Sequence, residues 1–283
     1  MNVAALLAAV VVGTWNGNWF PSGRAEHRAH PDVEAATISA AAKMIAGGLK
    51  AVDPEGTNDV ILCLNEIRGP RVATNLLAQI GRPGLKMAIV SGYRRRDRFD
   101  QQQDVIATTL PVAEAHWSRW KMSGKTFPPR GYAFAAVVVD PATTANVYAV
   151  HLKSNYGATT AEKRLDNRAK RTAAIAQVVD QERKRRGRPQ RPVILAGDMN
   201  ADRWRKEFAE EALFGLLEDA GFANPLAALP PTARGTHPSR TYGDSALDYV
   251  FCRGFDTVGL PHIEPNQSLS DHKPLFVVLS ARQ

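Results

Sequence analysis

The 283-residue sequence predicts an α/β fold built on mixed β-sheet. Two observations lead to this prediction. Short apolar runs typical of buried strands alternate along the chain with longer segments whose apolar residues recur at helical spacing. Most of the predicted strands also carry polar residues directly at one end. With 44% hydrophobic residues, the chain can bury a full core in one large domain or two small ones.

The first half of the chain begins with a strand and a helix. Residues 10–14 are a β-branched run, and residues 33–49 place Ala, Ile and Met at helical spacing up to the Gly47-Gly48 pair. The elements predicted next are a strand at 60–64, a helix at 71–80 ended by Gly81, a strand at 85–90, and a charged loop or hairpin at 94–104 that leads into a strand at 105–110.

The second half continues the alternation. Residues 133–139 and 146–150 are predicted to form a hairpin across the turn sequence DPATTA. A long, very basic helix follows, from Thr160 to about Arg186. The remaining elements are a short buried strand at 193–196, a helix at 207–220 closed by Gly221, a Pro-rich linking segment, and strands at 247–252 and 275–279.

Polar residues gather at the ends of six predicted strands. Four strands carry them just after their C-terminal ends, and two late strands carry them at or before their N-terminal ends. In chain order these residues are Asn16, Glu66, His151 with Asn155, Asp198 with Asn200, Asp248, and Asp271 with His272. Antiparallel neighbours in a mixed sheet place the start of one strand beside the end of another. We therefore expect the six strand ends to meet at one edge.

These side chains suit phosphoester chemistry. Carboxylates and amide oxygens are the ligands that Mg²⁺ and Mn²⁺ prefer, whereas zinc favours more His or Cys. Several carboxylates at one edge would repel one another unless a cation lay among them. His151 and His272 can exchange protons near neutral pH. A divalent ion with two histidines and several acids predicts phosphodiester cleavage, in which one group activates water and another protonates the leaving oxygen.

Each of these residues has a simpler explanation when it is taken alone. Asn16 is a common type of turn former, Glu66 can form a surface ion pair with Arg68, and His151 can be a buried core histidine. The functional interpretation depends on all of them occurring together.

The order of the motifs resembles that of the endonuclease/exonuclease/phosphatase superfamily, which includes DNase I, abasic-site endonucleases, neutral sphingomyelinases and inositol-polyphosphate phosphatases. The resemblance spans residues 10–279, which is nearly the whole chain, and its most specific part is GDMN followed later by SDHKP. The matching segments are TWN at 14–16, NE at 65–66, HLKSN at 151–155, GDMN at 197–200, LDYVF at 247–251 and SDHKPL at 270–275.

The resemblance implies one domain with a DNase I-like fold, a four-layer α/β sandwich in which two mixed sheets pack face to face with helices outside. It also implies a metal site. Glu66, aided by Asn16, and Asp271 would bind Mg²⁺ or Mn²⁺, with Ca²⁺ as a further option. Asp198 and Asn200 would position the attacking water and the phosphate.

The resemblance implies roles for the two histidines as well. His272 would act as general base or as a phosphate-polarising partner, oriented by Asp248. His151 would serve as general acid or phosphate ligand, with Asn155 close by. Arg130, in PPRGY, resembles an arginine that contacts the scissile phosphate in relatives, although a plain surface arginine is an equal alternative.

The environment of His151 departs from the family pattern. Abasic-site endonucleases usually carry tyrosine at this place, so the chain resembles the DNase I, sphingomyelinase and phosphatase branches more closely. DNase I-like enzymes pair the histidine with a nearby acid. The comparable segment here, FDQQQD, has glutamines at 102–103 and acids only at Asp100 and Asp104, so the partner of His151 stays open.

We expect a metal-dependent phosphodiester hydrolase, and first of all a nuclease acting on DNA or RNA. The formal net charge of +8 favours an anionic partner such as nucleic acid. One alternative is a phosphatase or phosphodiesterase acting on inositol phosphates or on a lipid such as sphingomyelin. For that alternative, WSRWKMSGKTFPP is the nearest candidate for a membrane-contacting hairpin. A non-catalytic binding module is weakened because no catalytic position is missing.

The remaining expectations concern the ends and surroundings of the chain. No apolar run reaches the roughly 18–20 residues needed to span a bilayer, so we expect no stable membrane insertion. Residues 1–9 are expected to be an N-terminal extension or the remnant of an export signal, which slightly favours a secreted or periplasmic location over a cytoplasmic one. We further expect a monomer in which Cys63 and Cys252 are buried free thiols.

Overall fold

The computed structural model describes residues 9–23, 30–95, 98–99, 102–185, 191–239, 243–265 and 268–282. Its helices are α1 Pro31–Val52, α2 Pro70–Ile80, α3 Ala161–Lys184 and α4 Ala212–Asp219, with short 3₁₀ turns at Lys206–Phe208, Pro225–Ala228 and Pro231–Ala233. Its strands are β1 Ala9–Phe20, β2 Asp59–Ile67, β3 Lys86–Val90, β4 Arg94–Arg95, β5 Arg98–Phe99, β6 Gln103–Thr108, β7 Val112–Arg119, β8 Gly131–Asp140, β9 Thr143–His151, β10 Val193–Asp198, β11 Asp248–Arg253, β12 Phe255–Ile263 and β13 Leu275–Ala281.

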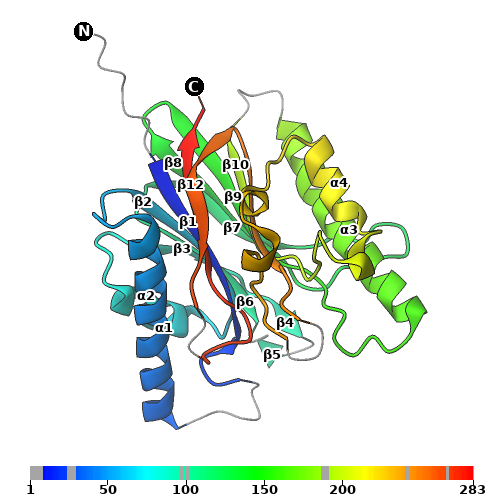
Figure 1. Cartoon of the computed structure of the whole chain (residues 1–283), viewed down its shortest axis with the longest axis horizontal. Coiled ribbons are helices and arrows are strands. Elements are labelled where there is room, and N and C mark those ends of the chain that lie inside the picture. The colour runs from blue at the N-terminus through cyan, green and yellow to red at the C-terminus, as the bar shows by residue number, and fades with distance from the viewer. Residues whose placement is uncertain are drawn as a thin grey trace.

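The long strands form two mixed sheets that pack face to face. One sheet has six strands in the order β12-β13-β1-β2-β6-β3, and the other has five in the order β11-β10-β9-β8-β7. In Figure 1, α1 and α2 lie on the outer side of the first sheet, while α3 and α4 lie on the outer side of the second. This arrangement confirms the four-layer α/β sandwich.

Alternating side chains of the strands supply two cores. Val11 and Leu62 pack against α1 and α2, whereas Val10 and Val12 belong to the apolar layer shared with the five-stranded sheet. Since successive strand residues point to opposite faces, the uninterrupted apolar run of β1 is buried on both sides. The sequence shows no polar face here because neither face of this strand meets water.

The strand ends with polar residues do meet, but they come from two sheets rather than from one edge. In the six-stranded sheet, β1 runs parallel to β2 and antiparallel to β13. In the five-stranded sheet, β10 runs parallel to β9 and antiparallel to β11. The C-terminal ends of four strands and the N-terminal ends of β11 and β13 therefore lie at the same end of the sandwich.

Two strands of the structure, β7 and β12, were not predicted from the sequence. β7 carries exposed polar residues at a sheet edge, and β12 contains Gly259 and Pro261, so neither has the apolar run on which the prediction relied. Helix α1 continues past the Gly47-Gly48 pair to Val52. Gly48 lies so close to β13 that a Cβ would stand 2.0 Å from the Phe276 ring. Glycine is therefore needed here for close packing and does not mark the end of the helix.

The predicted helix at 207–220 is wrong over its first turn. A 3₁₀ turn occupies Lys206–Phe208, and α4 begins only at Ala212. Glu211 has extended backbone, with φ −72° and ψ 104°, and its carboxylate is buried in an ion pair with Arg171 of α3. This tertiary contact fixes the start of α4 in a way that helix propensity does not reveal.

The cysteines, the absence of apolar spans and the N-terminal residues were also the subject of predictions. Cys63 and Cys252 are free and buried, as predicted. Across the residues described, no helix is long and apolar enough to cross a membrane. The expected N-terminal extension falls mainly on residues 1–8, which lie outside the described residues, and Ala9 already belongs to β1.

Candidate active site

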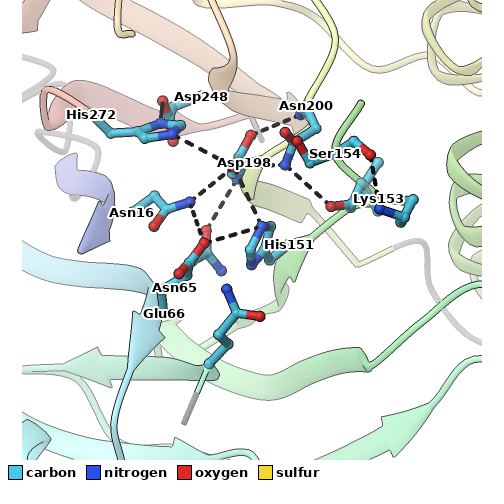
Figure 2. A network of polar contacts seen from close by, with 12 residues as sticks. Asn16, Asn65, Glu66, His151, Lys153, Ser154, Asp198, Asn200, Asp248 and His272 are labelled. Carbon is cyan, nitrogen blue, oxygen red and sulfur yellow. Dashed lines mark hydrogen bonds and ion pairs between the residues drawn. The ribbon is translucent and has the colours of Figure 1, made fainter. Parts of the chain in front are cut away.

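Asn16 and Glu66 lie in the C-terminal parts of β1 and β2, the two parallel central strands of the six-stranded sheet, and their side chains meet. Asn16 donates from Nδ2 to Glu66 Oε1 over 3.4 Å and to Asp198 Oδ2 over 2.9 Å, so it joins carboxylates from the two sheets (Figure 2). Its Oδ1 accepts the backbone N–H of Asn18 over 2.9 Å, and Glu66 Oε2 accepts that of Trp19 over 3.1 Å. A short turn after Asn16 therefore fixes both side chains.

The backbone of this end of the sandwich is strained. Asn18, Trp19, Glu66 and Asn200 all have left-handed φ angles, of 49°, 60°, 58° and 51°. Residues other than glycine rarely adopt this conformation, and a bulky residue such as Trp19 adopts it least readily. The register of β1 and of β2 shifts at the same places. Strained backbone of this kind persists only where surrounding contacts hold it in place, and it is most common at functional sites.

Asp198 lies at the centre of the cluster, at the end of β10 and almost fully buried (Figure 2). Its Oδ1 accepts the backbone N–H of Asn200 over 2.8 Å, and its Oδ2 accepts the Asn200 side-chain amide over 2.8 Å. Burial raises the pKa of Asp198 to about 7, because the charged carboxylate has lost its water, and nearby Asp248 adds to the rise. Asp198 can thus change protonation state near neutral pH.

Gly197 explains why the chain can turn at this point. Its φ is +138°, and a Cβ there would stand 1.9 Å from the carbonyl oxygen of Val150 and 2.9 Å from Asn65 Oδ1. Only glycine allows β9 and Asn65 to approach Asp198 this closely.

His272 and Asp248 form the shortest pair in the cluster. His272 Nδ1 donates to Asp248 Oδ2 over 2.7 Å, and its Nε2 lies 3.9 Å from Asp198 Oδ2. Burial by itself would lower the pKa of His272, but the Asp248 and Asp198 carboxylates outweigh it and raise the pKa to about 10. The bond to Asp248 therefore directs the Nε2 edge of the imidazole toward Asp198.

His151 faces the same carboxylates from β9. Its Nε2 lies 3.6 Å from Glu66 Oε1 and 3.6 Å from Asp198 Oδ2. Its Nδ1 is buried and has no hydrogen-bond partner among the described residues. Burial, and after it the positive charge of Arg130, lowers the pKa of this imidazole well below its usual range, so His151 is neutral.

Neither acid of FDQQQD is seen to pair with His151. Asp104 is fully buried, where it accepts from Asn65 Nδ2 over 2.7 Å and from the Tyr93 hydroxyl over 3.0 Å. Asp100 lies outside the described residues. The carboxylates nearest to His151 are Glu66 and Asp198 themselves.

Asn65 is a site residue whose role the sequence did not reveal. Its Oδ1 accepts the backbone N–H of Asp198 over 3.1 Å, while its Nδ2 donates to Asp104 over 2.7 Å. One fully buried amide thus links the two sheets directly beneath the cluster. Its place before Glu66 was visible in the sequence, but only the packing of the sheets shows what it contacts.

His237 was also missed. Its Nε2 lies 3.6 Å from Asp271 Oδ2, and its ring packs edge-on against His272 with ring centroids 4.8 Å apart. The side chain of Asp271 is 51% exposed, so this carboxylate stands at the rim of the cluster. The only sequence signal was a histidine in the polar segment before LDYVF.

Arg130 and Asn155 are placed beside the cluster rather than inside it. Arg130 donates to the carbonyl oxygens of His151 and Leu152 over 3.2 and 3.0 Å and to Gln102 over 3.2 Å. Asn155 Oδ1 accepts from Arg171 of α3 over 3.2 Å. In this structure both residues hold the loop after β9, and their contact with phosphate stays a prediction.

The donor set fits a hard divalent cation. Glu66, Asp198, Asp248 and Asp271 supply carboxylate oxygens around one end of the sandwich, and in the described part of the chain neither Glu66 nor Asp198 is paired with Lys or Arg. Among the described residues, the side chains that contact the carboxylates of Glu66, Asp198 and Asp248 directly are histidines and amides, so the cluster can accept a cation. Asn16 presents its amide nitrogen to the carboxylates, so its service as an oxygen ligand stays a prediction.

Comparison with known proteins agrees with this geometry. Residues 13–272 match the model of the Endonuclease/Exonuclease/phosphatase family. An endonuclease/exonuclease/phosphatase from Beutenbergia cavernae DSM 12333 superposes with a TM-score of 0.65 at 17% identity, covering 97% of this chain and 72% of that one.

Two further solved structures are similar. A family protein from Leptotrichia buccalis C-1013-b gives a TM-score of 0.64 at 12% identity, covering 96% of this chain and 99% of that one. A humanized TDP2 from D. rerio gives 0.63 at 13% identity, covering 97% and 100%. No curated protein matches the sequence. At these identities the solved structures establish the shared fold.

Proposed function

The chain belongs to the Endonuclease/Exonuclease/phosphatase family, a family of phosphoester hydrolases, and we propose that it is a nuclease that uses Mg²⁺ or Mn²⁺ to cleave the phosphodiester bonds of DNA or RNA. The observation that supports this most strongly is the His272–Asp248 pair, which directs the Nε2 edge of the imidazole toward Asp198. A hydrogen-bond donor fixed at this place can stabilise the negative charge that grows on the phosphate oxygens when water attacks a phosphodiester.

Asp198 is the group we assign to the attacking water. Its Oδ2 accepts from the side-chain amides of Asn16 and Asn200, at 2.9 and 2.8 Å, and its Oδ1 accepts from the Asn200 backbone N–H at 2.8 Å, so both oxygens are fixed before substrate binds. A buried carboxylate is a stronger proton acceptor than one in water, which suits it to take a proton from water near neutral pH.

The two histidines take different roles in this proposal. His272, fixed by Asp248, donates from Nε2 to a non-bridging phosphate oxygen and neutralises its growing charge. His151 offers its Nε2 between Glu66 and Asp198 as a neutral hydrogen-bonding group that orients the phosphate. Of the two roles that the sequence left open for each histidine, these geometries favour phosphate binding in both cases.

Glu66 and Asp271 are the residues we assign to the divalent ion, with Asn16 beside them. When bound, the ion supplies Lewis-acid polarisation of the phosphate. Glu66 is fixed for this task by Asn16 and by the Trp19 backbone N–H.

Charge favours a nucleic acid over a small uncharged ligand. The chain carries a formal net charge of +8, and two cationic side chains, Arg130 and Lys153, lie next to the cluster in the loop region around the end of β9. Contacts from lysine and arginine to phosphates dominate the affinity of proteins for DNA and RNA at moderate salt.

A lipid phosphodiester is the second candidate, and one observation favours it. Residues 121–127 form a small hairpin through the Ser123–Thr126 bridge, and its Met122 and Phe127 side chains are 68% and 49% exposed. Apolar side chains beside lysines suit contact with a membrane surface.

The test compares substrates under one set of conditions. Supercoiled plasmid, single-stranded DNA and RNA are incubated with Mg²⁺ or Mn²⁺ beside sphingomyelin vesicles, inositol phosphates and a simple phosphomonoester. We expect nicking of plasmid that EDTA abolishes. Turnover of sphingomyelin or a phosphomonoester with nucleic acids left intact would contradict the nuclease assignment.

A further inference from the structure

Two histidines and one aspartate converge at the rim of the candidate site. Suitable ligand atoms of His237, Asp271 and His272 all lie within 4.8 Å of one another. His237 Nε2 is 3.6 Å from Asp271 Oδ2, and His272 Nε2 is 4.0 Å from Asp271 Oδ1. These spacings are close to those of ligands around one tetrahedral ion, since Zn–N and Zn–O bonds of about 2.0–2.2 Å bring neighbouring ligand atoms to about 3.5 Å.

The backbone holds this group rigidly. His237 exchanges two backbone hydrogen bonds with Ser245, of 2.8 and 2.9 Å. Next to it, Thr236 accepts the N–H of Lys273 on its carbonyl oxygen and the N–H of Asp248 on its hydroxyl. The segment with His237 is thereby tied both to the start of β11 and to the segment with His272. A preformed arrangement of this kind binds a metal without a large ordering cost.

The chemistry of the three side chains is that of a zinc-type site. Imidazole and carboxylate together suit Zn²⁺, Co²⁺ or Ni²⁺, whereas Mg²⁺ prefers oxygen ligands alone. His272 also has the outer partner that zinc-binding histidines usually have, because its Nδ1 donates to Asp248 and leaves Nε2 for the metal. With the side chains of His237 27% and Asp271 51% exposed, an ion can enter from solvent.

We propose that His237, Asp271 and His272 form a site for a divalent ion of the Zn²⁺ class, and that an ion bound there inhibits the enzyme by occupying His272 Nε2. The site shares Asp271 and His272 with the catalytic cluster, but its third ligand, His237, takes no part in the proposed reaction. Inhibition by zinc rests on the proposed nuclease function, whereas zinc binding does not. Zinc competes with the proton on Nε2, so binding is measured at one fixed pH.

The simpler explanation is that His237 only pairs with Asp271. A half-exposed ion pair of this kind contributes little to stability, and on this explanation His237 would not contribute to zinc binding. The two explanations differ in what a metal titration shows.

Metal binding is tested first, on the full chain stripped of metal. Zn²⁺ is titrated against a chromogenic chelator, and Co²⁺ is followed by the visible absorption of a tetrahedral complex. The His237→Gln variant keeps a polar side chain but loses the imidazole, and Asp271→Asn serves as a second variant. His262→Gln is the matched control, because His262 is 32% exposed and also faces one carboxylate, Glu264.

We expect wild type and His262→Gln to bind one Zn²⁺ with equal affinity, and both site variants to bind it more than about tenfold more weakly. The Co²⁺ complex of the wild type should absorb as a tetrahedral site, and this absorption should be lost in His237→Gln. Equal zinc affinity in wild type and His237→Gln, or an octahedral Co²⁺ spectrum in the wild type, would overturn the site.

Inhibition is tested second, with Zn²⁺ added to the Mg²⁺-supported reaction on plasmid. The zinc concentration that halves the rate should exceed the measured dissociation constant and increase with the Mg²⁺ concentration, because both ions use Asp271, and at fixed Mg²⁺ it should rise in His237→Gln by about the same factor as that constant. Zinc that binds without slowing cleavage would overturn the inhibitory role and leave the site standing. Absence of any hydrolysis by metal-supplemented wild type would contradict the proposed function, while the binding titration would still decide the site.

Discussion

His272 and Asp248 are joined by a 2.7 Å hydrogen bond, although they belong to different sheets. Asp248 is the first residue of β11 in the five-stranded sheet, and His272 lies three residues before β13 in the six-stranded sheet. The bond therefore forms only when both sheets are packed together. It couples the fold of the sandwich to the charge of the imidazole that we assign to the phosphate.

Removing either partner should impair catalysis. We expect His272→Ala to lower kcat by about 10²–10³-fold, the range typical of losing one hydrogen-bond donor that stabilises the transition state. Asp248→Asn should lower kcat by about 10²–10³-fold, because the imidazole loses the carboxylate that stabilises its charge. Steady-state kinetics on plasmid or a short duplex measure both values. If Asp248→Asn raised KM alone and left kcat unchanged, this account of the pair would be wrong.

Asn65 should matter for both stability and rate. Asn65→Ala removes the side-chain acceptor of the buried Asp198 N–H and one of the donors to the Asp104 carboxylate, so we expect a loss of about 1–3 kcal/mol in the free energy of unfolding. The kcat should fall as well, because the backbone of Asp198 is no longer held. Urea unfolding and initial rates measure the two effects.

Asn146→Ala is the matched control for Asn65. Asn146 is equally buried and donates to Glu182, but it lies near the other end of β9, away from His151. It should lose comparable stability and keep its kcat. Equal losses of kcat in the two variants would mean that Asn65 acts only through general stability.

Gly197 should tolerate no side chain. Gly197→Ala places a Cβ 1.9 Å from the Val150 carbonyl oxygen at a φ of +138°, so β10 must move and Asp198 with it. We expect lost activity and a loss of about 3 kcal/mol or more in unfolding free energy. Gly215→Ala, in α4 with open space around the new methyl group, should instead gain about 0.5–1 kcal/mol and retain activity.

Asp104 should make stability depend on pH. Burial raises its pKa to about 7 in the folded protein, above the ordinary value of 3.8, so the folded state holds a proton that the unfolded chain has released. The stabilising contribution is complete below pH 3.8 and is lost as the pH rises through 7, with a total of the order of 4 kcal/mol.

Asp104→Asn is the variant that isolates this effect, because it keeps the shape and the contact with Asn65. The difference between the unfolding free energies of wild type and variant should fall steadily from pH 4 to pH 8. A difference that stays constant over this range would show that Asp104 is ionised throughout.

The sequence was most informative about residues at the ends of strands. Asn16, Glu66, His151, Asp198 and His272 lie together because strand ends position them, and strands are recognisable from local apolar runs. The two-sheet sandwich, in contrast, was implied only by the family resemblance, because the strand ends alone predicted a single edge.

What the sequence did not reveal depends on packing between elements. Asn65 bridges two sheets, His237 reaches Asp271 through the path of a loop, and Glu211 ends up against Arg171. None of these contacts follows from periodicity, because each joins residues far apart in the chain. The edge strands β7 and β12 were missed for a related reason, since exposed residues leave them without an apolar pattern.

We assign to the carboxylate of Asp198 the activation of the water that hydrolyses the phosphodiester at this cluster. The most direct measurement is the initial rate of plasmid nicking with Mg²⁺ or Mn²⁺ by wild type and by Asp198→Asn, at equal concentrations of protein shown by circular dichroism to be folded. We expect rapid, EDTA-sensitive nicking by the wild type. The variant should be slower by at least about 10²-fold, because it lacks the general base. A folded Asp198→Asn protein that nicks plasmid at the wild-type rate would contradict this assignment.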